Sequence, residues 1–122
     1  MACGGYGKIL EPVQIGSKIK MAVNFGYQGT SITLDDLDDV TLTYYSPISK
    51  LTGVVLTKAD LIRRETTVGQ TSTVEWFAIV DTSLVGKGQM KLRAEAMIPD
   101  GDIMILAQRK EIEVCDTNVV IV

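Results

Sequence analysis

The chain has 122 residues and a mass of 13.3 kDa, which is the size of one ordinary domain. Hydrophobic residues make up 46% and charged residues 22%, so a packed globular core is expected. The net charge is −3 and histidine is absent. We therefore expect no nucleic-acid and no membrane partner, since no basic excess neutralises phosphates. The commonest catalytic base and metal ligand is also missing.

The composition favours strands. The chain holds 13 valines, 12 isoleucines and 12 threonines, whose β-branched side chains fit a pleated surface. Its longest apolar runs have four or five residues, as at 103–107, whereas a membrane-spanning helix needs about twenty. Residues 1–8 are rich in glycine and are expected to form a flexible N-terminal arm. A single domain is expected over residues 9–122.

Alternating apolar residues predict the first half of the domain. Ile9–Ile15 contains Pro12, which a strand tolerates at a sheet edge or a bend. Lys18–Phe25 is the clearest strand, and Val40–Tyr45 alternates in the same way. Their inward residues are predicted to be Ile19, Met21, Val23, Phe25, Val40, Leu42 and Tyr44.

The middle of the chain holds one ambiguous segment. Leu51–Thr57 reads as a strand in which Gly53 indicates a bulge or a close approach. Lys58–Glu65 fits either one helical turn capped by Thr57 or the end of a strand.

The second half alternates again. In Thr71–Val80, one face carries Trp76, Ala78 and Val80, and the other carries Phe77 and Ile79. Gln89–Ile98 and Ile103–Glu113 are further strands, separated by a turn at residues 99–102. These elements predict an all-β fold, an Ig-like antiparallel β-sandwich of about seven strands.

Few residues suggest chemistry. Asp35, Asp36, Asp38 and Asp39 crowd one turn, where carboxylates suggest a Ca²⁺ loop. Their spacing departs from that of known calcium loops and favours a solvated turn that caps backbone amides. The stretch 86–88, Gly-Lys-Gly, lacks the features of a phosphate-binding loop. No metal site and no cofactor are expected.

Nucleophiles lack a base. Four serines (Ser46, Ser49, Ser72 and Ser83) are candidates by residue type only, and no strained turn or histidine accompanies them. Cys3 and Cys115 lie at opposite ends of the chain. A bridge between them is geometrically conceivable, and free thiols are the simpler interpretation. We expect no catalytic site and no enzyme activity, since a site would have to combine residues such as Asp100 and Asp102 with a lysine.

Two aromatic pairs, Tyr44–Tyr45 and Trp76–Phe77, lie on predicted strands. Neighbouring residues of a strand point to opposite faces, so one of each pair belongs to the core. Tyr45 and Phe77 are the expected outward pair, and they indicate a protein contact.

In several stretches, the pattern of turn and strand residues resembles that of small Ig-like virion modules of tailed bacteriophages, including crAss-like phages of gut Bacteroidales. These stretches are residues 19–25, 29–34, 81–88 and 98–102, and the similarity covers most of residues 15–115. The resemblance implies a virion structural protein that acts by protein–protein contacts. Because the sequence stops at Val122 where longer modules continue into fibre parts, we expect a capsid auxiliary or decoration protein, or a fibre-anchoring protein.

The resemblance also implies partners and a place. The expected partners are major capsid, fibre or tail proteins, together with further copies of the chain in a homo-oligomer, and the expected location is the virion, after synthesis in the host cytoplasm. The alternatives are a tail or baseplate adaptor and a carbohydrate or cell-surface binding module. The apolar end, Val119–Val122, is expected to pair with a neighbouring subunit, so that a chain cut after Asp116 folds but assembles poorly.

Overall fold

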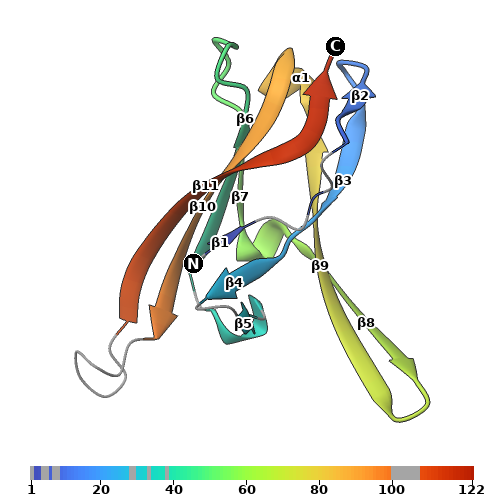
Figure 1. The fold of residues 1–122 in the computed structure, drawn as a ribbon, viewed down its shortest axis with the longest axis vertical. Helices are drawn as coiled ribbons and strands as arrows, with labels where there is room; N and C mark the ends of the chain where they lie inside the picture. The colour runs from blue at the N-terminus through green and yellow to red at the C-terminus, as the bar shows by residue number, and fades with distance from the viewer. Residues whose placement is uncertain are drawn as a thin grey trace.

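The computed structural model describes residues 2–3, 6, 9–27, 30–32, 34–37, 39–99 and 108–122. Strands dominate these residues (Figure 1). The strands are β1 (Ala2–Cys3), β2 (Glu11–Val13), β3 (Lys18–Ala22), β4 (Phe25–Tyr27), β5 (Thr30–Ile32), β6 (Val40–Tyr45), β7 (Val54–Thr57), β8 (Ile62–Val68), β9 (Thr71–Asp81), β10 (Gly88–Pro99) and β11 (Gln108–Ile121). The helical elements are η1 (Leu34–Asp36), η2 (Lys58–Asp60) and α1 (Thr82–Val85).

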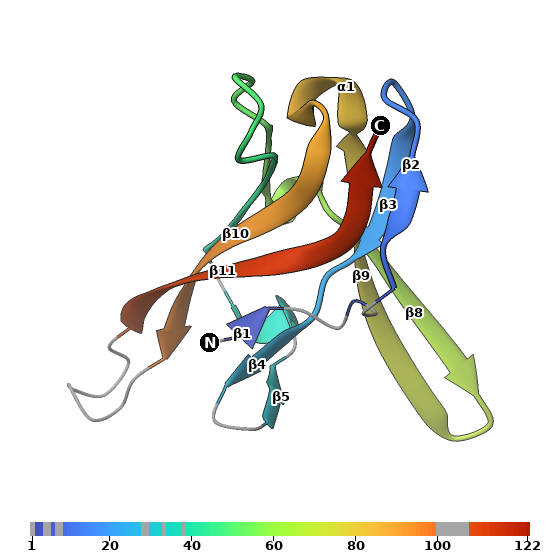
Figure 2. The same ribbon diagram turned by 45° about the horizontal axis from the view of Figure 1, so that its top comes forward.

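Two sheets face each other across the core. One has five strands in the order β2-β11-β10-β6-β7, and the other has the order β3-β9-β8. A third small sheet, β1-β4-β5, completes the fold (Figure 2). Neighbouring strands are antiparallel, except that β2 runs parallel to β11. The predicted all-β sandwich is confirmed. The count of about seven strands is not, because the described residues form eleven.

The predicted alternation explains the core. The buried side chains come from alternate positions of the facing strands, so each strand presents one side to the interior. They include Met21, Val40, Leu42, Tyr44, Ala78, Val80, Met90, Leu92, Ala94 and Ala96.

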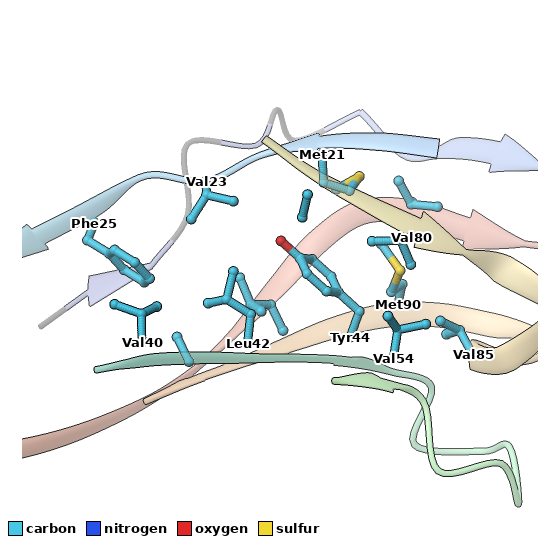
Figure 3. Packing of buried hydrophobic residues seen from close by; sticks show 14 of the residues in the cluster. Met21, Val23, Phe25, Val40, Leu42, Tyr44, Val54, Val80, Val85 and Met90 are labelled. Carbon is cyan, nitrogen blue, oxygen red and sulfur yellow. The ribbon is translucent and has the colours of Figure 1, made fainter. Parts of the chain in front are cut away.

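Tyr44 is the largest side chain without exposure to solvent. It reaches from β6 across the core toward the strand that carries Met21 (Figure 3). Gly53, at φ 84°, lies so close to the backbone oxygen of Tyr44 that a Cβ there would collide with it. The close approach predicted at Gly53 is therefore present, and it requires glycine for both conformation and space.

The segment Lys18–Phe25 forms two strands instead of one. Val23 still donates its amide to the Trp76 carbonyl at 2.9 Å, but after Asn24 the chain leaves β9 and enters the β1-β4-β5 sheet. The inward alternation continues through the break, since Met21, Val23 and Phe25 are all buried. The pattern of side chains therefore does not reveal the change of sheet.

The ambiguous segment contains both alternatives. Lys58–Asp60 forms η2, and β8 begins at Ile62. The Asp60 carboxylate accepts hydrogen bonds from the Thr57 amide at 2.9 Å and the Thr57 hydroxyl at 3.0 Å. Thr57 and Asp60 thus close the start of a single turn.

The first residues include structured parts. Ala2 and Cys3 pair with Gly26 and Phe25 of β4, where an arm outside the sheets was expected. The Tyr6 hydroxyl donates to the Ala22 carbonyl at 2.7 Å. The described part of residues 1–8 is therefore attached to the sandwich.

Cys115 is disulfide-bonded, so the expectation of a free thiol at this position is wrong. The other cysteine of the sequence, Cys3, belongs to β1, a strand that contacts β11. β1 and β11 therefore lie close together in the fold, which the spacing of the cysteines in the sequence does not reveal. A domain of this size does not need a disulfide to fold, but this gives no reason to expect that its cysteines stay reduced.

The C-terminal residues are an interior strand, and not a docking edge as expected. Val119 and Ile121 are buried, and β11 lies between β2 and β10 at this point. The amide of Val122 also donates to Val13, and its carbonyl accepts from Ile15, both at 2.9 Å. A cut after Asp116 would remove the buried side chains of Val119 and Ile121, which counts against the expectation that such a chain still folds.

Ile121→Ala is expected to lower the free energy of unfolding by about 2–5 kcal/mol, as for other large-to-small core changes. The matched control is Val122→Ala, whose side chain is 49% exposed and whose loss should cost less than about 0.5 kcal/mol. Urea unfolding followed by tryptophan fluorescence measures both. Equal effects of the two changes would contradict the placement of Ile121 in the core.

Reduction of the disulfide at Cys115 is expected to lower the free energy of unfolding by about 2–4 kcal/mol. Urea unfolding with and without reductant measures the change, and Cys115→Ser without reductant should match the reduced protein. Intact mass after alkylation gives an independent readout. Alkylation of the native, unreduced protein would refute the bond.

Candidate protein-binding surface

The β8–β9 hairpin extends beyond the packed sheets (Figures 1 and 2). All seven residues of β8 are exposed, as are Thr71, Ser72 and Thr73 at the start of β9. The strands pair from Ile62–Phe77 out to Val68–Thr71. A two-stranded ribbon on its own is only marginally stable in water. The outer half of this hairpin is therefore a surface suited to a neighbour.

The tip of the hairpin is a tight turn. Gly69 and Gln70 join the two strands, and Gly69 has φ 61°. Both two-residue turns that match the twist of a hairpin require positive φ at this first position, which glycine adopts without strain. Behind the tip, the hydroxyls of Thr67 and Ser72 lie 3.1 Å apart in a hydrogen bond.

An ion pair fixes the base of the hairpin. The guanidinium of Arg63 in β8 donates two hydrogen bonds to the Asp35 carboxylate, both at 3.0 Å. This fork-to-fork geometry orients both groups. The pKa of Asp35 is held below its ordinary value, first by the Arg63 hydrogen bond, and the pKa of Arg63 is raised by the same contact.

Lys58 and Trp76 complete the base. The Lys58 ammonium donates to the Leu37 carbonyl at 2.7 Å and lies 5.8 Å from the Trp76 ring centre. The Trp76 indole nitrogen is buried without a hydrogen-bond partner among the described residues. The turn that carries Asp35 is therefore attached to η2 and β8.

An apolar patch continues from this base onto the outside of the β3-β9-β8 sheet. We call Ile62, Phe77 and Ile79 the outer patch. Ile62 lies opposite Phe77, and Phe77 and Ile79 share one face of β9. Ile62 is 40% and Ile79 41% exposed. Scattered apolar residues are normal on a surface, but neighbours of this kind indicate a contact.

Cations border the outer patch. The Lys20 ammonium is 4.5 Å and the Arg64 guanidinium carbon 5.6 Å from the centre of the Phe77 ring. Such contacts cover the ring while leaving the charges in water. The outer patch thus combines apolar area with positive charge at its border.

The predicted outward pair is not brought together. Phe77 and Tyr45 are both half-buried on the outer faces of their strands, but Phe77 belongs to β9 and Tyr45 to β6, in the other sheet. The expected exposure of Ile79 is confirmed. Sequence reasoning missed Arg63 and Lys20, and their spacing in the sequence gives no signal, since Arg63 acts on Asp35 of η1 and Lys20 on Phe77 of β9.

The aspartate cluster is only partly within the described residues. Asp35 is engaged by Arg63, and the Asp39 carbonyl accepts from the Met97 amide at 3.1 Å. Asp38 and the Asp36 side chain lie outside the described residues. In the part of the chain that the structure describes, no group of acidic and cysteine side chains is arranged to hold a metal ion.

The four serines make hydrogen bonds within the fold, one of them, from Ser46, over a long sequence distance. Ser46 donates to the Lys87 carbonyl at 2.8 Å, and Ser83 donates to the Asp81 carboxylate at 2.6 Å. Ser49 accepts from the Leu51 amide at 3.1 Å, and Ser72 bonds Thr67 as described above. These contacts stabilise turns. Asp100 and Asp102 lie outside the described residues.

No family model matches this chain, and neither a curated protein nor a solved structure matches it. The similarity to phage virion modules therefore stays a resemblance. Within the described residues, no helix has the length and apolar character needed to cross a membrane.

Asp35→Asn is expected to release the base of the hairpin, and amide exchange in β8 should become roughly two- to five-fold faster. The matched control is Asp116→Asn, which breaks the exposed pair with Lys91 on the other sheet. Hydrogen exchange read by mass spectrometry distinguishes the two. Unchanged exchange in β8 of Asp35→Asn would contradict the role of the ion pair.

Acid should act in the same direction as Asp35→Asn. Because the folded-state pKa of Asp35 lies below its ordinary value of 3.8, the ion pair contributes fully above that value and is lost as the pH falls through the lowered pKa. Exchange in β8, corrected for its intrinsic pH dependence, should therefore be constant from pH 7 to about 5 and rise below about 4. A rise that begins above pH 6 would contradict this assignment.

Proposed function

We propose that this chain is a structural protein of a tailed-phage particle, a capsid auxiliary or decoration protein or a fibre-anchoring protein, that acts by protein–protein contacts. The observation that carries the proposal is the β8–β9 hairpin, which extends from the sandwich with all of β8 exposed. The resemblance of the sequence to virion modules is the reason for proposing that the assembly is a phage particle.

The hairpin and the outer patch form one continuous surface. Ile62 belongs to both, and Phe77 and Ile79 follow on β9. A neighbour that covers them would remove apolar area from water at about 25 cal/mol per Å². It would also give the ribbon the second layer that two strands need for stability. This surface therefore has a reason to be covered in an assembly.

The charged border indicates the chemistry of the neighbour. Lys20 and Arg64 flank the Phe77 ring, so a complementary surface would carry carboxylates around an apolar centre. The partners that we propose are major capsid, fibre or tail proteins and further copies of the chain. A tail or baseplate adaptor would use the same surface, and its location in the particle distinguishes the two functions.

The experiment is mass spectrometry of purified particles, followed by substitution of the outer patch. Ile79→Ser should leave the chain folded and lower its incorporation about tenfold, since one apolar side chain carries about 1.5–3 kcal/mol when fully buried. Ile48→Ser is the matched control, because Ile48 is 78% exposed and lies outside the outer patch. Absence of the chain from particles would overturn the proposed function. Equal incorporation of the two variants would overturn the assignment of the outer patch as the contact surface.

A further inference from the structure

A groove of about 430 Å³ opens at the edge of the sandwich between β2 and β3. Each of these strands is the last of its sheet, so the groove lies where neither sheet continues. Its apolar lining comes from both sheets and includes Val13, Ile19, Met21 and Val119. Polar groups of Glu11, Lys20 and Asn118 lie around it. It is separate from the outer hairpin, because β8 is at the opposite edge of the β3-β9-β8 sheet.

The backbone of β3 has one unused side. The Thr82 amide donates to Ser17 at 3.0 Å, and the Val23 amide donates to Trp76 at 2.9 Å. Between these bonds the register is constant, and in an antiparallel ladder alternate residues direct both polar groups to the partner strand. Lys18, Lys20 and Ala22 therefore direct their amides and carbonyls away from β9, toward the side of the groove.

Both ends of this unused edge are closed. At one end the Tyr6 hydroxyl donates to the Ala22 carbonyl at 2.7 Å. At the other, the Ser17 amide donates to the Gln14 carbonyl at 3.2 Å and closes the turn from β2 to β3. Between them the polar groups of Lys18 and Lys20 have no backbone partner among the described residues. An edge of this kind is a template for another strand.

The neighbouring edge of β2 differs. Val13 and Ile15 direct their backbone groups to Val122, so by the same alternation Pro12 directs its backbone toward the groove. Proline has no amide hydrogen and cannot donate there. A strand that enters the groove is therefore held by β3 and not by β2.

We propose that the groove binds a short extended segment of another protein, which adds a strand to β3 and places alternate apolar side chains over Val13, Ile19 and Met21. The pairing covers about the five residues of β3. Main-chain hydrogen bonds supply affinity in this mode of recognition, and alternate side chains supply specificity.

The positive charges of β3 indicate which residues the bound segment carries on its solvent-facing side. The side chains of Lys18 and Lys20 are exposed on the outside of the sheet, beside the residues of the bound segment that point to solvent. Acidic residues at those positions pair with the two lysines. The preferred segment therefore alternates apolar and acidic residues.

The test uses a fluorescent heptapeptide of alternating valine and aspartate, titrated against the full chain. Two further peptides carry N-methyl groups on either the valine or the aspartate amides. In a bound strand one set of amides faces β3 and the other faces solvent. Methylation of one set should weaken binding at least tenfold, and methylation of the other should leave it within about twofold.

Two protein variants isolate the backbone contact. Lys20→Ala and Lys20→Pro both remove the ammonium group, but only the proline also removes the outward amide, and an edge strand tolerates proline at such a position. Lys20→Pro should bind at least fivefold more weakly than Lys20→Ala. Thermal melting monitors the fold of both variants. A third variant, Tyr6→Phe, removes the hydroxyl that bonds the Ala22 carbonyl. It leaves the backbone groups of Lys18 and Lys20 unchanged and should not weaken binding.

Three peptide-binding results would overturn the proposal. They are absence of binding at millimolar peptide, equal binding of the two methylated peptides, and equal binding by folded Lys20→Pro and Lys20→Ala. A dimer of the chain that Lys20→Pro abolishes and the peptide does not displace would assign the edge to a second copy, and would also overturn it. None of these results bears on incorporation through Ile79, so the proposed function is tested separately.

Discussion

Tyr44 is the largest fully buried side chain among the described residues, and several constraints of this fold meet at its ring. It spans the gap between the two sheets (Figure 3). Its backbone oxygen excludes any residue larger than glycine at position 53. Burial first, and then the neighbouring Tyr6 phenol, raise the pKa of Tyr44, so both rings stay neutral at ordinary pH. Tyr6 in turn bonds Ala22, and the core is thereby linked to the closed end of the β2–β3 groove.

The period-two pattern predicts what lies inside this fold but not which strands meet. Val40, Leu42 and Tyr44 were assigned inward from their alternation and are buried, because a strand with one buried face must alternate. The same pattern continues through Val23 and Asn24, where the chain changes sheet. Alternation reports the face of each residue and carries no information about the partner strand.

The ends of the chain show the same limit. Four apolar residues at 119–122 were interpreted as an edge because nothing in the sequence shows that β2, more than a hundred residues away, lies beside them. The adjacency of β1 and β11, and with it the disulfide at Cys115, is hidden for the same reason. Long-range pairings are fixed by the whole topology, and a local pattern is compatible with several of them.

The candidate surface was predictable only in part. Phe77 and Ile79 were assigned to the outer face of their strand, since they alternate with Ala78 and Val80. The Asp35–Arg63 pair joins residues 28 positions apart, and no local motif specifies it. The aspartate cluster suggested a calcium loop by composition, but the Arg63 guanidinium occupies the Asp35 oxygens that a cation would need.

Three edge strands of this sandwich, β2, β8 and β3, are protected unequally, and this inequality bears on where a partner fits. Pro12 removes a donor from β2, and the charged residues Arg63, Arg64 and Glu65 interrupt β8, both of which are devices that discourage unwanted pairing. The five residues of β3 carry two lysines but no proline, and their groove has an apolar floor. Lysine repels a basic or another lysine-bearing strand while it attracts an acidic one, so β3 admits a strand selectively where β2 excludes it. The described parts of the N-terminal segment, β1 and Tyr6, are bonded to β4 and Ala22. The two contact surfaces that we propose, the hairpin and the β3 edge, therefore lie at opposite sides of one small sheet.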